Sequence, residues 1–440
     1  MSAPASALPP MAPQCLSGGL PLLLLPRSGP QILAARLVIR GGSGADPSGQ
    51  RGAHQLLAGS MTRGCGDLDA DALADLVEGA GASLRAEAHE DALVIGLKCA
   101  ADDAPALLPL LLALVRQPRL ERDQVEIEQQ LNLQTLQRQR EDPYQLAHDR
   151  LRGLLYGTGP YGHDPLGVEE DLWGLGSDEL GALAGQLGRW GAGLVVCGTI
   201  PSDVVELLQR PLAGSPWSTS APAASFAEPS LGIPAGPSLA TLEQDTEQLV
   251  LMLGAATVPL GHPDALALRL LQTHLGSGMS SRLFQVMREE RGLAYDVGVS
   301  LPARCGPAPF VIHLSSSAER AIDAADALSQ EWQRMLELSL SEEELALALA
   351  KYQGQDAMGR QTCGQIAERQ ALLLSHALPL DHVERCLRQA PTLSGDDLRR
   401  AARRWLQAPK LSLVGPAAAL EAACRRWNPA EFSGGVSQQL

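Results

Sequence analysis

Hydrophobic and polar residues follow two different periods along the first half of the chain. Short apolar runs bounded by Gly and Pro predict strands at 20–25, 32–39, 92–98 and 194–197. Apolar positions three or four residues apart predict helices at 51–62, 69–79, 104–117, 122–140 and 178–187. The pattern therefore mixes strands with long helices.

The second half repeats this order. A strand at 248–254 precedes a helix at 263–275, a Gly/Ser loop and another helix, and the remaining elements are strands at 293–299 and 310–316 and a helix at 318–338. Two halves of similar order favour an old duplication. We expect an α+β fold of two similar domains, each a largely antiparallel sheet packed against helices.

Residues 211–238 differ from the rest of the chain in composition. They are rich in Pro, Ser, Ala and Gly and carry no periodic apolar positions, which is typical of a linker. This predicts an N-terminal domain at 15–210 and a C-terminal domain at 239–440.

The composition limits the classes of partner. The formal net charge of -15 opposes binding to phosphate backbones, so we expect no nucleic acid partner. The one dense basic cluster, Arg399, Arg400, Arg403 and Arg404, has the spacing of a single helix face. A negative surface either attracts basic peptides or simply keeps the protein in solution.

Cysteine usage and hydropathy indicate a cytoplasmic protein. The eight cysteines are scattered singly and form no C-x-x-C pair, as expected for reduced thiols. No cation precedes the apolar run at 20–25, whereas a secretory signal requires one. No run approaches the roughly 18 apolar residues of a membrane span, so we expect no membrane partner.

The most informative segment is 275–297, LGSGMSSRLFQVMREERGLAYDV. Its glycines permit a tight turn, Ser280 or Ser281 can cap a helix, and Gly292 is a common helix stop. The expected apolar face of this helix consists of Leu283, Phe284 and Met287. Alternation from position 293 onward predicts a half-buried strand.

This segment resembles the second-domain signature of pitrilysin/insulinase-type metallopeptidases, the inverzincins. In that family an Arg near the helix end and a Tyr seven positions later recur together, and Arg288 and Tyr295 match them. The resemblance implies that both residues bind a peptide substrate near the scissile bond. A guanidinium can hold carbonyls by forked hydrogen bonds, and a phenol can donate to an oxyanion. Alternatively, Arg288 caps a helix end and Tyr295 fills the core.

The same family binds zinc through an inverted motif, H-x-x-E-H, on a helix of the first domain. The two His bind the metal and the Glu activates a water molecule. In the matching segment, 40–64, His54 stands at the first ligand position, Leu57 at the Glu position and Ala58 at the second His position.

The family's third ligand is a Glu on a later helix. The alignment places Thr135 there, although a slip by a turn would bring Glu126 or Glu128 nearer. No slip restores the motif, and one His cannot hold a hydrolytic zinc, which needs three protein ligands. We therefore expect no metal in this chain.

An Arg/Tyr pair without a zinc motif is only part of an active site, which implies that a partner chain supplies the rest. The resemblance implies a homologous half-length subunit with an intact H-x-x-E-H that brings the zinc. This chain is then expected to be inactive alone and to be the non-catalytic, substrate-binding subunit of a heterodimeric zinc metalloendopeptidase that acts on peptides or unfolded segments. The alternatives are an inert structural scaffold and a peptide-binding chaperone of the same family.

Overall fold

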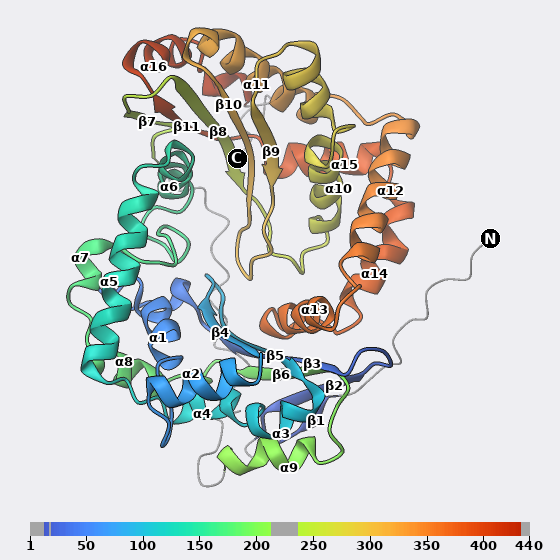
Figure 1. Cartoon of the computed structure of the whole chain (residues 1–440). Helices are drawn as coiled ribbons and strands as arrows, with labels where there is room; N and C mark the ends of the chain where they lie inside the picture. Colours follow the sequence, from blue (N-terminus) through green and yellow to red (C-terminus); the bar gives the residue numbers. More distant parts are fainter. Residues whose placement is uncertain (1–12, 17–18, 213–235, 433–440) are drawn as a thin grey trace, which may run out of the picture. The chain divides into compact units, whose positions relative to one another are not determined.

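The computed structural model describes residues 13–16, 19–212 and 236–432 (Figure 1). The chain divides into two compact units. The first unit is built from Met1–Gln134, Asp164–Ser225 and Met358–Val383, and the second from Thr135–His163, Phe226–Ala357 and Glu384–Leu440. Of the predicted linker 211–238, residues 213–235 lie outside the described part, so the predicted boundaries at 210 and 239 stay a prediction.

The sheet of the first unit has the strand order β1-β2-β6-β3-β5-β4. One pair, β2 with β6, is parallel, and the other neighbours are antiparallel. The strands are β1 (Gln14–Cys15), β2 (Pro21–Pro26), β3 (Ile32–Arg40), β4 (Ser83–Ala88), β5 (Ala92–Ala100) and β6 (Ala192–Gly198).

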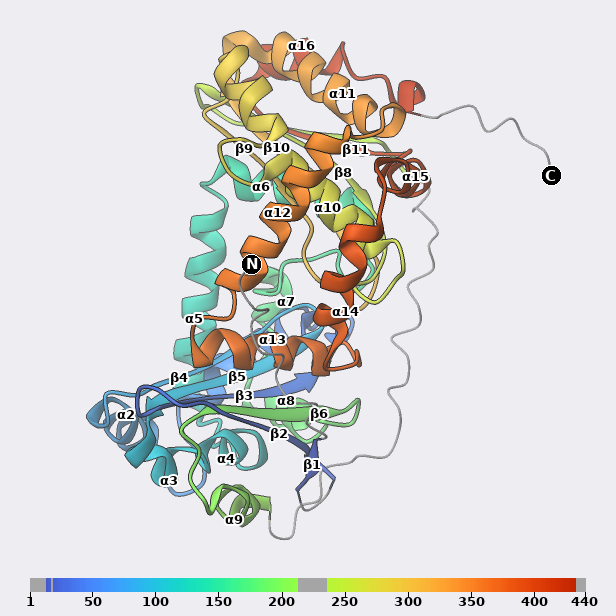
Figure 2. The same cartoon turned by 90° about the vertical axis from the view of Figure 1, so that its right-hand side faces the viewer.

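Helices cover both faces of this sheet, which explains why the central strand β3 is buried at consecutive positions. Figure 2 shows α13 on one face and α3 and α4 on the other. The helices are α1 (Ala53–Met61), α2 (Ala70–Gly79), α3 (Ala104–Leu107), α4 (Leu110–Arg116), α5 (Arg122–Gln139), α7 (Glu169–Leu172), α8 (Ser177–Ala184), α9 (Val204–Gln209) and α13 (Cys363–Ser375).

The sheet of the second unit has the order β7-β11-β8-β10-β9, again with one parallel pair, β7 with β11, and antiparallel neighbours elsewhere. Its strands are β7 (Leu239–Glu243), β8 (Gln248–Ala256), β9 (Asp296–Ser300), β10 (Pro309–Ser317) and β11 (Lys410–Gly415). Five strands of the first sheet, in the order β2-β6-β3-β5-β4, correspond one by one to β7-β11-β8-β10-β9 of the second. The two units therefore have the same topology. This confirms the expected fold class of two similar α+β domains.

The second unit buries a large apolar core on one face of its sheet, where Leu251, Phe310 and Trp332 are fully buried. Its helices are α6 (Pro143–Tyr156), α10 (Ala265–Gly276), α11 (Ala321–Glu337), α12 (Glu342–Met358), α14 (His382–Gln389), α15 (Gly395–Trp405) and α16 (Ala417–Cys424), together with η4, a π-helical segment at Phe284–Glu290.

The second face of each sheet is covered by a helix that comes from the other half of the sequence. On the first sheet, Ile366, Ala367 and Ala371 of α13 pack against β2, β3 and β6. On the second sheet, Ala147 and Leu151 of α6 pack against β8 and β11. Each compact unit is therefore completed by one helix that is distant from it in sequence.

Some elements differ from their prediction. The helix expected at 104–117 is two short helices, because Pro109 lacks a backbone N–H and interrupts the hydrogen-bond ladder. The strand expected at 293–299 begins only at Asp296.

The eight cysteines are free, as expected, and burial raises the pKa of the Cys65 and Cys99 thiols to about 11. In the part of the chain that the structure describes, no helix has the length and apolar composition of a membrane crossing.

Candidate functional site

A buried carboxylate holds the N-terminus of α1. Asp46 Oδ2 accepts the N–H of Gly52 at 2.6 Å, and Asp46 Oδ1 accepts the N–H of His54 at 3.0 Å. Gly52, the N-cap residue, has a positive φ of 102°, which suits glycine, and it has no side chain to cap the helix. Asp46 therefore satisfies helix N–H groups from the preceding loop.

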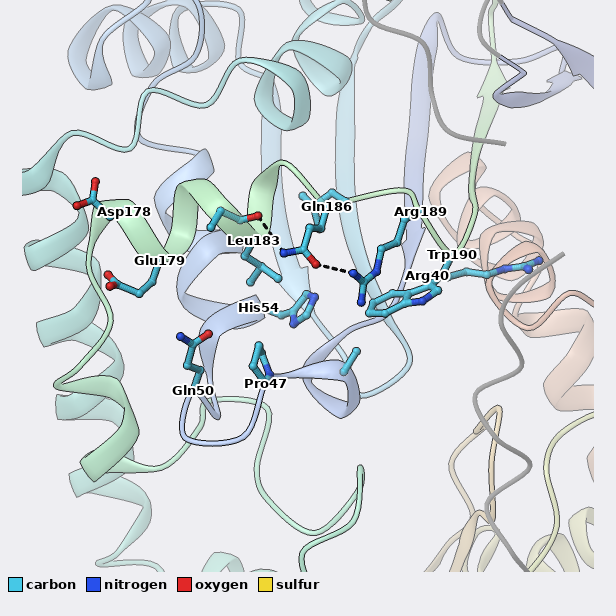
Figure 3. A pocket seen from close by; sticks show the side chains of 13 residues that line it. Arg40, Pro47, Gln50, His54, Asp178, Glu179, Leu183, Gln186, Arg189 and Trp190 are labelled. Atoms are coloured by element: carbon cyan, nitrogen blue, oxygen red, sulfur yellow. Dashed lines mark hydrogen bonds between the residues drawn. The ribbon is translucent and has the colours of Figure 1, made fainter. Parts of the chain in front are cut away.

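The same carboxylate orients His54. Asp46 Oδ1 lies 2.7 Å from His54 Nδ1, and the two side chains are 0% and 1% exposed. Because an ionised carboxylate only accepts hydrogen bonds, the geometry places the imidazole proton on Nδ1. The ring lines a cavity of about 300 Å³, whose wall also includes Gln50, Glu179 and Trp190 (Figure 3).

Leu57 and Ala58 are core residues. Both are 0% exposed, on the buried side of α1. Neither side chain contains an atom that can bind a metal. Among the described residues, no group of three or more ligand side chains clustered within 4.8 Å includes His54. The donor set at the motif positions therefore does not fit a zinc ion, which needs three protein ligands.

The carboxylates that an alignment slip would bring near the motif have other partners. Glu128 lies against α1, but its Oε1 accepts from Arg63 Nε at 2.6 Å, and its other oxygen occupies the space beside Gly59. Glu126 is exposed and pairs with Arg122. Thr135 lies farther along α5, where its hydroxyl accepts from Arg138 at 3.0 Å.

An open sheet edge begins beside α1. Gln55 Oε1 of α1 accepts the N–H of Ala88, the last residue of β4, at 2.8 Å. This N–H therefore points away from β5. Since antiparallel pairing alternates, Ala86 and Leu84 direct their N–H and C=O groups outward as well. Within the described residues, β4 is the outermost strand of its sheet, so these groups form a free edge.

We did not predict β4 from the sequence. Its segment, SLRAEA, alternates polar and apolar residues over six positions, and the burial pattern follows that alternation. The run is short and weakly hydrophobic, which is typical of an edge strand. Period-two alternation immediately before the turn at 89–91 was the signal that could have identified it.

In the second unit, a partly buried ion pair anchors the segment that carries Arg288. The Arg282 guanidinium donates to both oxygens of Glu331, at 2.9 and 2.8 Å, and the Glu331 side chain is 6% exposed. From Phe284 onward the helix is π-helical rather than α-helical, a form that is rare and frequent at functional sites. Met287 is buried, while Arg288 is exposed with its guanidinium 5.0 Å from the centre of the Phe284 ring.

Tyr295 lies on the surface immediately before β9. Its side chain is 72% exposed, so it does not fill the core, and its backbone N–H donates to Ser315 O at 3.1 Å. Arg288 and Tyr295 thus both present exposed side chains from one short segment of the second unit. In the described part of the chain, the neighbouring strand β9 is an edge strand of the second sheet, as β4 is of the first.

A partly buried histidine, His313, supports the start of β9. His313 Nε2 lies 3.3 Å from a carboxylate oxygen of Asp296, and the Tyr144 ring packs edge-on against the imidazole at 5.2 Å. Gly298 makes room for the ring, because a Cβ there would lie 2.6 Å from it. Burial lowers the pKa of His313 despite Asp296. Sequence reasoning did not find this cluster, since its members are distant in sequence.

Two family models match consecutive segments of the chain. A family model described as insulinase (peptidase family M16) matches residues 24–166, and one described as the peptidase M16 inactive domain matches residues 192–352. An uncharacterized zinc protease of Streptomyces coelicolor is 25% identical over 324 residues, which cover 71% of this chain and 70% of that protein. One of Mycobacterium tuberculosis is 24% identical over 355 residues, 80% of each chain.

Solved structures share the fold. A peptidase M16 inactive domain from Pseudomonas fluorescens superposes with a TM-score of 0.83 at 23% identity, covering 92% of this chain and 98% of that one. A protease from Helicobacter pylori gives a TM-score of 0.81 at 18% identity, covering 93% and 100%. The two family models follow one another along the sequence, and the fold agrees with both structures. The chain therefore belongs to the insulinase family of peptidases, M16.

Proposed function

We propose that this chain is the non-catalytic, substrate-binding subunit of a heterodimeric zinc metalloendopeptidase that acts on peptides or unfolded segments. It binds no zinc itself. A homologous half-length partner with an intact H-x-x-E-H supplies the zinc and the general base, and this chain holds the substrate.

One observation carries the proposal. The helix that bears the zinc motif in this family is kept here as a well-capped element, yet two motif positions, Leu57 and Ala58, are buried aliphatic residues. The remaining motif position, that of the first ligand, holds His54, whose imidazole is hydrogen-bonded to Asp46. An apolar core residue cannot act as a metal ligand or as a general base, so hydrolysis requires groups from another chain.

Two features support a role in peptide binding. The free edge of β4 offers outward N–H and C=O groups at Leu84 and Ala86, the groups with which an extended peptide adds a strand to a sheet. Arg288 and Tyr295 present a guanidinium and a phenol to solvent. In a complex that supplies the metal, these groups suit a peptide carbonyl and a developing oxyanion.

The test is peptide binding by the purified chain. We expect a fluorescently labelled extended peptide to bind, measured by anisotropy. Ala86→Pro should weaken binding at least fivefold, because proline removes an outward N–H without breaking the β4–β5 ladder. Ala86→Ser, which keeps the N–H, is the matched control. Two results together would identify the chain as an inert scaffold. The purified chain would bind no peptide, and replacing Arg288 and Tyr295 would leave the rate of hydrolysis by a reconstituted complex unchanged.

A further inference from the structure

A polar hollow of about 340 Å³ lies on one face of the first sheet, along the strand with the free edge. The strand β4 contributes Ser83, Arg85 and Glu87, and β5 contributes Gly96 and Lys98. These are alternate positions of each strand, so their side chains project from the same face. A peptide strand paired with β4 would place every second side chain over this hollow.

The strand register gathers cations around a glycine. Gly96 of β5 pairs with Arg85 of β4 on one side and with Arg36 of β3 on the other. Because Gly96 has no side chain, the Arg36 guanidinium lies across it, and a Cβ there would be 3.0 Å from Arg36 Nη1. Lys98 and its partner Ser83 form the next row on the same face.

The charges in the hollow are not balanced. Three cationic side chains, Arg36, Arg85 and Lys98, face two carboxylates, Glu87 and Glu368. Glu368 already pairs with Arg36 at 2.6 Å. Among the described residues, no ion pair involves Arg85 or Lys98, and both are exposed. A local excess of positive charge in a chain of net charge -15 favours an anionic ligand here.

We infer that this hollow selects acidic side chains in a peptide bound along β4, with the carboxylate held by Arg85 and Lys98. The inference rests on the proposed peptide-binding function. A side chain opposite Arg85 would have its Cβ about 5 Å from that of Arg85. Ser83 is small, so a Glu opposite it has an open path to Lys98. Glu87, two positions beyond Arg85, repels an acidic side chain opposite itself and so sets the register.

The experiment compares three labelled extended peptides that differ only at two alternate positions, which carry Glu, Gln or Lys. Affinity for the full chain is measured by anisotropy at low and at moderate salt. The Glu peptide should bind roughly tenfold more tightly than the Gln peptide, since charge-assisted hydrogen bonds are the stronger kind. The Lys peptide should bind most weakly, and salt should reduce the differences.

A charge-reversed variant tests the residues. In Arg85→Glu combined with Lys98→Glu, the order of the three peptides should invert, while circular dichroism shows the fold unchanged. The control is Arg122→Glu, one reversal of the same kind at an 88% exposed position of α5 in the same unit, which should leave the order unchanged.

The outcomes separate this inference from the function on which it rests. Equal affinity for the Glu and Gln peptides, with Ala86→Pro still weakening all three, would overturn the acidic preference and leave peptide binding in place. An unchanged order in the charge-reversed variant would overturn the assignment to Arg85 and Lys98. Absence of binding to all three peptides would remove the proposed function as well.

Discussion

Asp46 shows how one residue can hold the local structure of a helix whose motif positions include a Leu and an Ala. Its carboxylate accepts two backbone N–H groups of α1 and the Nδ1 proton of His54, and it is fully buried. Removing it would leave these donors unsatisfied inside the protein. The helix geometry at the motif therefore depends on Asp46 more than on His54.

We predict that Asp46→Ala lowers the free energy of unfolding by about 2–3 kcal/mol, through the lost cap and the unpaired donors. Urea denaturation followed by circular dichroism measures this. Asp71→Ala, at an exposed position in the first turn of α2, is the control and should change stability by less than about 0.5 kcal/mol. Equal effects of the two substitutions would contradict the capping role of Asp46.

The sequence shows which residues stand at the motif positions, but it does not show how the helix that carries them is held in place. A Leu or an Ala has no donor atom, so Leu57 and Ala58 can be judged from their identity alone. The role of Asp46 depends on a loop that brings it back to α1, and the sequence has no period that indicates this. The same holds for Asp296 and His313, which become neighbours only through the pairing of β9 with β10.

Two histidines of the second unit should make stability depend on pH. Burial lowers the pKa of His274 and of His313. As the pH falls through the ordinary histidine pKa of about 6.5, the unfolded chain takes up protons that the folded chain disfavours. Stability is therefore lost as the pH falls from about 6.5 toward the lowered folded pKa values, and it is restored above about 6.5.

The variants His274→Gln and His313→Gln should reduce this dependence. We expect the difference in unfolding free energy between about pH 7.5 and about pH 5.5 to be smaller in each variant than in the natural chain. Urea denaturation at the two pH values gives the comparison. A pH dependence that is unchanged or steeper in both variants would show that these residues do not contribute.

At the scale of elements, the pair Arg282–Glu331 decides where the Arg288 segment lies. Glu331 is on the buried face of α11, and Arg282 lies two residues before the start of η4 at Phe284. The forked hydrogen bond thus joins the start of the π-helical segment to the core of the unit. In the function that we propose, Glu331 positions Arg288 through this anchor.

Glu331→Ala should destabilise the second unit by about 3 kcal/mol, because it leaves the Arg282 charge partly buried without its partner. It should also weaken peptide binding at the Arg288 segment. Hydrogen exchange of the β9 and β10 amides measures the first effect. Asp323→Asn, which breaks the exposed pair of Asp323 with Arg320, should cost less than about 0.5 kcal/mol. Comparable exchange in the two variants would argue against the anchor.

Prediction of the elements succeeded where periodicity was strong. The strands β3, β5 and β8 and the helices α1, α5 and α11 were expected within a few residues of their observed bounds. The π-helical form of η4 was not expected, since its residues also satisfy an α-helical spacing. The packing of α6 and α13 on the sheets of the opposite halves was not predicted, because an apolar helix face does not specify which sheet it covers.

At the scale of the whole molecule, the acidic composition and the ion pairs of the basic face both argue against a nucleic acid partner. The chain is acidic, and the basic face at Arg399, Arg400, Arg403 and Arg404 is largely neutralised: Arg399, Arg400 and Arg404 pair with carboxylates and Arg403 donates to Leu336 O. This supports the expectation that nucleic acid is not a partner. Among the described residues, Arg85 and Lys98 in the hollow along β4 have no such ion pair, which is why we assign a ligand to them.

We propose that two chains of one family share the reaction: this chain binds the substrate, and its partner supplies the zinc. Zinc content together with peptide hydrolysis tests this proposal most directly. The purified chain should contain far less than one zinc per molecule and cleave no peptide. Combined with a co-purified homologue that has an intact H-x-x-E-H, it should support hydrolysis, and Tyr295→Phe should lower the rate at least tenfold with the complex intact. Stoichiometric zinc and peptide hydrolysis by the purified chain alone would contradict the account.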